Sequence, residues 1–224
     1  MINYVLPILA VLCGLLLVLV IKPEKKGNLK LLLAFSGAFL LSLTVFDLLP
    51  EVYTQSVSSE VGIFIMSGIF IQIFLEFFSK GAEHGHVHVR KGNPHFPWLL
   101  FSSLSIHSIL EGFPLHLYES LVFGIVIHKI PIAMILTSFF LDKGISRIKV
   151  TVLLVIFAFM TPLGSLLSDN LSFIQPYLTQ ISAIVIGIFL HISTTILFES
   201  SEGHTFNIRK LTVIALGVIT AYFI

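Results

Sequence analysis

The sequence has little charge and almost no cysteine. Only 11% of its 224 residues are charged and 56% are hydrophobic, whereas a soluble domain has roughly 25% charged residues. The single cysteine, Cys13, excludes an intramolecular disulfide and any C-x-x-C metal or redox motif. A net charge of +1 argues against a nucleic-acid partner. No polar stretch is long enough for a soluble domain, so the composition predicts an all-α integral membrane protein in which residues 1–224 form one domain.

Long apolar runs are abundant. A helix needs about 20 apolar residues to cross a bilayer, and eight segments approach that length: 2–21, 29–49, 61–78, 98–117, 121–141, 150–167, 177–198 and 206–224. The first has neither a basic leading region nor a small-residue cleavage pattern, which favours a retained span over a signal peptide. The last is the least secure, because Arg209 and Lys210 shorten it. We therefore expect eight spans, with seven as the alternative.

The charged residues between the spans alternate in sign. All but one of the lysines and arginines lie in or beside the first, third, fifth and seventh loops. The second, fourth and sixth loops contain no basic residue and only a few acidic ones, namely Glu51, Glu60, Glu119 and Asp169. Positive charge collects on the cytoplasmic side of membrane proteins. The pattern therefore predicts that both termini lie outside and that the odd-numbered loops lie inside.

The exceptional lysine belongs to a group of ionisable residues inside two consecutive spans. His107 and Glu111 lie one helical turn apart in 98–117, and His128 and Lys129 lie in 121–141. The short link between these spans makes them antiparallel neighbours, so the two histidines and Glu111 can meet at one depth. Two imidazoles and a carboxylate form a ligand set for zinc or a related divalent metal. Two structural alternatives remain open: a Glu111–Lys129 ion pair, and histidines hydrogen-bonded to neighbouring carbonyls.

Two prolines lie close to these residues. Pro114 follows Glu111, and Pro131 follows His128 by three positions. A proline inside a helix leaves a carbonyl one turn earlier without its partner. Interrupted helices at mid-membrane depth are a common feature of transport sites.

The motif H107-S-I-L-E-G112, followed by the H-K-I-P run from His128 to Pro131, resembles the fourth and fifth helices of the ZIP (Zrt/Irt-like) metal transporters. D47-L-L-P-E51 and T161-P-L-G164 are similar to two further motifs of that family. The resemblance extends over the whole chain. It implies a 3+2+3 arrangement in which spans one to three and six to eight form an inverted repeat around the metal-bearing pair. It also implies import of metal into the cytoplasm by alternating access, with the site-bearing helices sliding against a scaffold.

The chain differs from many ZIP transporters at a second, adjacent metal site. Family members commonly have Asn and Asp at the positions of Ser108 and Lys129, and a carboxylate at the position of Ile132. The ammonium of Lys129 would occupy the place of that second cation. We therefore expect a mononuclear site formed by His107, Glu111 and His128, with water, Ser108 or His191 completing the coordination.

Other polar residues are weaker candidates. Asp47 and Glu51 could attract entering cations, although a solvated helix end explains them equally well. The loop 79–97 contains three alternating histidines, His84, His86 and His88. They could capture or sense metal ions, or they could belong to an ordinary polar loop. Three residues at the inner end of the seventh span could border an exit, or could be ordinary loop residues: Glu199, Glu202 and His204.

Three classes of function fit these residues. The first is transport of divalent metal, with zinc as the substrate, no prosthetic group and no enzymatic activity. The second is an intramembrane zinc hydrolase, although the H-E-x-x-H motif is absent. The third is a b-type cytochrome with histidine axial ligands, which leaves Glu111 unexplained. The expected location is the cell membrane, or the inner membrane if the source is a Gram-negative bacterium. The expected partners are metal ions and lipid. The small residues Gly37 and Ala38 could also support a homodimer.

Overall fold

A computed structural model describes residues 1–21, 26–55, 58–79, 97–199 and 208–224, with the side chains at the edges of some gaps left out. Helices make up nearly all of the described chain, and no strand occurs in it. The α-helices are α1 (Ile2–Ile21), α2 (Lys26–Leu43), α3 (Leu49–Gln55), α4 (Ser58–Ser79), α5 (Trp98–Gly112), α6 (Glu119–Asp142), α7 (Arg147–Ala158), α8 (Met160–Asn170), α9 (Leu178–Glu199) and α10 (Ile208–Tyr222). Three shorter turns of helix connect some of them: the π-helix η1 (Thr44–Leu48) and the 3₁₀ helices η3 (Phe113–His116) and η4 (Gln175–Tyr177).

The prediction of an all-α membrane protein agrees with this architecture. Six of the helical stretches are long and apolar enough to cross a membrane: Ile2–Ile21, Asn28–Thr54, Ser59–Phe78, Glu119–Asp142, Arg147–Asn170 and Gln175–Phe198. The other two expected spans are also helical, but α5 and α10 have only 15 residues each. Helix α5 is continued by η3 to His116. The eight-span count therefore stays a prediction.

Prolines account for the interruptions in three of the expected spans. The π-helix η1 leads into α3, whose second residue is Pro50, so the second span continues to Gln55 rather than ending at residue 49. Pro114 lies in the 3₁₀ turn that ends the fourth span. In the sixth span Pro162 cannot donate a backbone hydrogen bond to Ala158, the residue at which α7 ends. Each interruption therefore lies within one turn of a proline.

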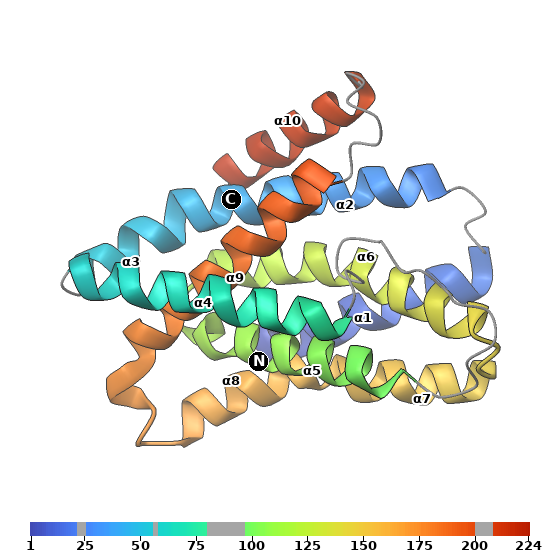
Figure 1. Ribbon diagram of the computed structural model, residues 1–224, viewed down its shortest axis with the longest axis horizontal. Helices are drawn as coiled ribbons and strands as arrows, with labels where there is room; N and C mark the ends of the chain where they lie inside the picture. Colours follow the sequence, from blue (N-terminus) through green and yellow to red (C-terminus); the bar gives the residue numbers. More distant parts are fainter. Residues whose placement is uncertain (22–25, 56–57, 80–96, 200–207) are drawn as a thin grey trace.

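Helix α6 occupies the centre of the bundle (Figure 1) and is the most enclosed of the six long helices. One apolar cluster packs one side of it against α1, α5 and α7. A second cluster packs its first half against α4, α9 and the residues around η1 and α3. Helix α10 lies at the edge, mainly against α2. The outer face of α4 carries large exposed apolar side chains, including Ile63, Phe70, Phe74 and Phe77, as expected for a surface in contact with lipid.

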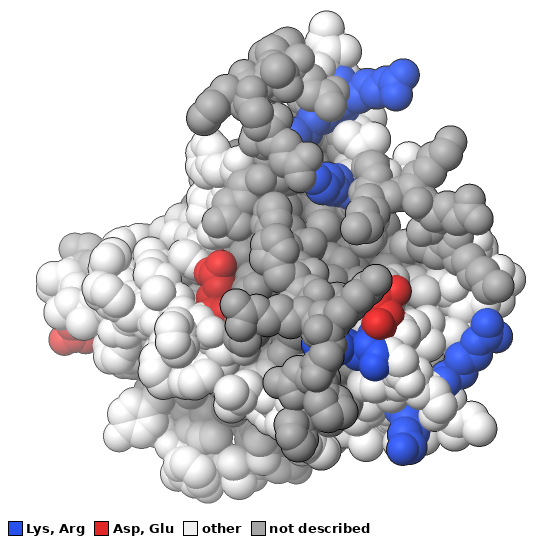
Figure 2. Space-filling view, turned by 45° about the vertical axis from the view of Figure 1, so that its right-hand side comes forward, with Lys and Arg blue, Asp and Glu red and all other residues white. Residues whose placement is uncertain are grey.

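The basic residues gather at one end of the bundle. The start of α2, the end of α6 and the starts of α7 and α10 lie together at the right-hand end of Figure 1. Figure 2 turns this end forward and shows several lysines and arginines on it. These elements carry Lys30, Lys143, Arg147, Lys149, Arg209 and Lys210. The described basic residues outside the buried centre therefore gather at the end that the predicted orientation places in the cytoplasm.

Glycines allow several helix pairs to approach closely, and at two of them an added Cβ would lie only 2.0 Å from a backbone oxygen. A Cβ atom on Gly164 of α8 would lie 2.0 Å from the carbonyl oxygen of Ile109 in α5. On the other side of the bundle, a Cβ on Gly187 of α9 would lie 2.0 Å from the carbonyl oxygen of Ile65 in α4. Small residues let helix backbones come together in a membrane, where apolar side chains gain little by leaving lipid.

We expect Gly164→Ala to destabilise the protein markedly, because the new methyl group must push the backbones of α5 and α8 apart. Overpacking of this kind typically costs about 1–3 kcal/mol. The matched control is Gly62→Ala in α4, where the nearest atom to the added Cβ is the Tyr53 hydroxyl at 4.0 Å. Thermal unfolding in detergent should show a lower midpoint for Gly164→Ala alone. Equal midpoints for the two variants would contradict the close contact.

Candidate metal site

The ionisable residues of α5 and α6 form one buried group. His107, Glu111, His128 and Lys129 are each 3% exposed or less. The Glu111–Lys129 ion pair, which the sequence left open as a structural alternative, is present, with Lys129 Nζ 2.5 Å from Glu111 Oε1. The ammonium also lies 4.6 Å from the ring centroid of Phe157 in α7. Three helices therefore enclose the lysine.

Two hydroxyl groups complete a closed ring of hydrogen bonds around this ion pair. The Lys129 ammonium donates to Ser108 Oγ. Ser108 Oγ lies 3.2 Å from Thr161 Oγ1, which donates to Glu111 Oε1 over 2.8 Å. Because each donor in such a chain polarises the next, the ring holds the Oε1 side of the carboxylate in a defined position.

The other carboxylate oxygen faces His107. The distance from His107 Nε2 to Glu111 Oε2 is 3.4 Å. Within the described part of the chain, neither ring nitrogen of His107 makes a hydrogen bond, and neither does Glu111 Oε2. Buried polar atoms normally have partners, because leaving them unsatisfied is costly. The two facing atoms, His107 Nε2 and Glu111 Oε2, are therefore candidate metal ligands when the imidazole proton is on Nδ1.

His128 lies beside this pair. The ring centroids of His107 and His128 are 6.4 Å apart and the ring planes make an angle of 77°. Among the described residues, no group of three His, Cys, Asp or Glu side chains is close enough to hold a metal ion in this conformation. The structure therefore brings His107 and Glu111 into contact and places His128 next to them without closing a three-ligand site.

The remaining candidate residues lie elsewhere. His191 Nε2 is 2.7 Å from Glu76 Oε2, so its imidazole contacts α4 rather than completing the site on α5 and α6. Asp47 is half-buried in the π-helix η1, and Glu51 is exposed on α3. Five candidates lie outside the described residues: His84, His86, His88, Glu202 and His204. The side chain of Glu199 is not described either.

Sequence analysis did not identify Thr161 as a member of this group. The T161-P-L-G164 motif was noted only for its similarity to a ZIP motif, whereas in the structure the Thr161 hydroxyl donates a hydrogen bond from α8 to Glu111. Polar residues on an otherwise apolar span were the available signal: Thr161 and Ser165 are four residues apart, and both are buried. The sequence does not show which helix that polar face meets.

The fold and these buried groups define a multi-pass membrane protein with an ionisable centre between its helices. The chain is similar to Protein zntD of Dictyostelium discoideum, with 31% identity over 160 residues. The aligned part covers 57% of this chain and 22% of that relative, so the chain spans about a fifth of the relative's length. No protein-family model matches the chain.

We expect Thr161→Val to weaken metal binding to this group, because Glu111 loses a hydrogen bond that orients it. Substitutions of groups that orient a ligand typically cost 10–100-fold in metal affinity. Thr161→Ser keeps the hydroxyl and should bind nearly as well as the unmodified protein. Titration of the purified protein with Co²⁺, followed by absorbance, measures the affinity. Equal affinities for the valine and serine variants would show that Thr161 does not position Glu111.

Proposed function

We propose that this protein transports divalent transition-metal ions across a membrane, with zinc as the main substrate and the cytoplasm as the destination. The observation that carries the proposal is the buried pair of His107 and Glu111, whose facing atoms make no hydrogen bond within the described residues. Ionisable groups inside a membrane are costly and are usually functional. Similarity to Protein zntD and the resemblance of the α5 and α6 motifs to ZIP transporters support the same function.

The spacing of the pair suits a metal ion. Zinc binds imidazole nitrogen and carboxylate oxygen at about 2.0–2.2 Å. Two such ligands at a tetrahedral angle lie about 3.4 Å apart by this geometry. The distance between His107 Nε2 and Glu111 Oε2 has this value, 3.4 Å. This separation supports the proposal that His107 and Glu111 are two of the metal ligands.

His128 would complete the site by a small movement. The centroids of two imidazole rings that share one tetrahedral zinc ion lie about 5 Å apart, whereas those of His107 and His128 are 6.4 Å apart. A shift of roughly 1 Å between α5 and α6 would bring His128 into range. A site that closes on binding and opens again suits a transported ion, which must be able to leave.

The helix contacts support an inverted repeat of the 3+2+3 kind. Helix α1 packs on α6, and the combined helix α7–α8 packs on α5. In the same way, α2 packs on α10 and α9 packs on α4. In such a repeat, α1 corresponds to α7–α8, α2 to α9, α4 to α10, and α5 to α6. The contact of α1 with α6 then corresponds to the contact of α7–α8 with α5, and the contact of α2 with α10 corresponds to that of α9 with α4. Such a repeat would allow the two sides of the membrane to gain access to the site alternately.

We expect alanine substitutions of the three proposed ligands, His107, Glu111 and His128, to abolish zinc uptake into proteoliposomes. The two histidine changes add no charge, whereas Glu111→Ala leaves the Lys129 ammonium without its carboxylate. Insertion of each variant is therefore checked by membrane fractionation before uptake is compared. Asp142→Ala, which removes an exposed carboxylate at the end of α6, should retain normal uptake. Uptake at the normal rate by the Glu111→Ala variant would refute the site.

We also expect one metal ion in the buried site, because the Lys129 ammonium stands 2.5 Å from Glu111 where a neighbouring cation would be placed. Anomalous scattering from crystals soaked in zinc would locate the ions. A double variant, Lys129→Asp with Ser108→Asn, supplies two further ligands and should admit a second ion beside the first. Two adjacent ions next to an intact Lys129 would show that the lysine does not replace the second metal.

A further inference from the structure

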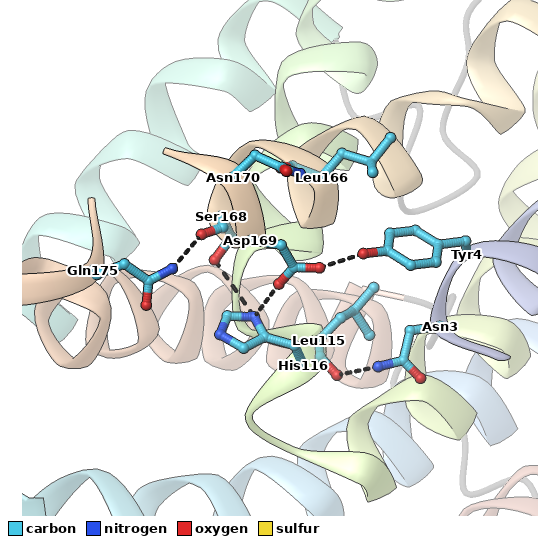
Figure 3. A network of polar contacts seen from close by, with 9 residues as sticks. All are labelled: Asn3, Tyr4, Leu115, His116, Leu166, Ser168, Asp169, Asn170 and Gln175. Carbon is cyan, nitrogen blue, oxygen red and sulfur yellow. Dashed lines mark hydrogen bonds and ion pairs between the residues drawn. The ribbon is translucent and has the colours of Figure 1, made fainter. Parts of the chain in front are cut away.

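A second histidine–carboxylate pair lies at the end of the bundle opposite the basic residues, the predicted outer end. Its members are His116, the last residue of η3, and Asp169, near the end of α8 (Figure 3). His116 Nδ1 lies 3.4 Å from Asp169 Oδ1. Neither residue belongs to the buried site on α5 and α6. Sequence analysis assigned no function to either of them.

The separation of the pair suits a metal ion better than a hydrogen bond. N–H···O hydrogen bonds are usually 2.7–3.2 Å long, whereas tetrahedral zinc ligands lie about 3.4 Å apart. The buried pair of His107 and Glu111 has the same separation, 3.4 Å. By contrast, His191 and Glu76 are 2.7 Å apart, so they are already hydrogen-bonded and would have to separate to admit an ion.

Neighbouring residues hold the pair in position. The Tyr4 hydroxyl donates to Asp169 Oδ2, which directs the other oxygen, Oδ1, toward His116. Ser168 Oγ lies 3.4 Å from His116 Nδ1. Asn3 Nδ2 donates to the carbonyl of Leu115 over 2.9 Å, and Gln175 Nε2 donates to the carbonyl of Ser168 over 2.7 Å. Hydrogen bonds that orient the ligands are typical of metal sites.

The surroundings would allow water to complete the coordination. The side chain of His116 is 25% exposed and that of Asp169 is 31% exposed. A metal ion held by one imidazole and one carboxylate would therefore keep some water ligands and bind weakly. The imidazole ligand favours zinc and similar transition metals over calcium and magnesium, which prefer oxygen ligands.

We propose that His116 and Asp169 form a second, solvent-facing site for a divalent transition metal, with water completing its coordination. A metal ion there would link η3 to α8, and through Tyr4 also to α1. Helix η3 directly continues α5, which carries His107 and Glu111. Occupancy would therefore hold the outer end of the site-bearing helix against α8. This binding is independent of whether the buried site transports metal.

The test uses a background variant that lacks competing ligands, and it does not depend on transport. In the full-length protein, alanine replaces the two histidines of the buried site and the other histidines that could compete, while Glu111 stays paired with Lys129. The replaced residues are His84, His86, His88, His95, His107, His128 and His204. Titration with Co²⁺ in detergent, followed by absorbance and calorimetry, should show one remaining weak site. Adding His116→Ala or Asp169→Asn should weaken that binding at least tenfold, and excess Mg²⁺ should not displace the Co²⁺.

Two controls identify the ligands. His191→Ala, which removes a histidine paired with Glu76, and Asp142→Ala, which removes an exposed carboxylate at the end of α6, should each leave the remaining affinity of the background unchanged. Tyr4→Phe should lower it several-fold, because Asp169 loses the hydrogen bond that orients it. Thermal unfolding without metal confirms that each variant is folded. No remaining Co²⁺ binding in the background, or binding that neither His116→Ala nor Asp169→Asn reduces, would overturn the proposal.

Discussion

The ion pair between Lys129 and Glu111 is the interaction on which the centre of this protein depends. Burying a charged side chain away from water costs several kcal/mol unless an opposite charge and further hydrogen-bond partners compensate for the lost hydration. Here the ammonium and the carboxylate are 2.5 Å apart, and the hydroxyls of Ser108 and Thr161 close a ring around them. The ring requires α5, α6 and α8 to come together at one depth. Glycine makes this approach feasible, because a side chain at Gly164 would collide with α5.

The same ion pair determines which atoms remain available to a ligand. Lys129 and Thr161 both bind Oε1 of Glu111, so the charge of the lysine is balanced on that side. Oε2 is left facing His107. A carboxylate with one oxygen bound by the protein and the other directed at an imidazole can add a cation without losing its existing partners. The ion pair thereby stabilises the buried group and leaves Oε2 directed at His107, as the proposed metal site requires.

Two other histidine–carboxylate pairs occur in the described residues. They differ from the buried pair in the nitrogen–oxygen distance and in exposure to solvent. His191 and Glu76 are at hydrogen-bonding distance and join α4 to α9. His116 and Asp169 are farther apart and partly exposed, at the end of α8. His107 and Glu111 have the wider separation in a fully buried setting. The same two residue types therefore form a helix contact, a partly exposed pair and a fully buried pair, and we propose metal binding only for the last two.

The sequence by itself determined the membrane character, the helical class and the approximate position of each helix, because apolar length and composition are local properties. It also indicated that His107, Glu111, His128 and Lys129 belong together, since helical spacing and a short connection place them at one depth. It did not reveal Thr161, the pairing of His191 with Glu76, or the contact between His116 and Asp169. Each of these contacts joins residues at least 50 positions apart. Only the tertiary structure shows these contacts. The rotation of each helix about its axis, and the helices it packs against, depend on close packing at glycines and prolines from other parts of the chain.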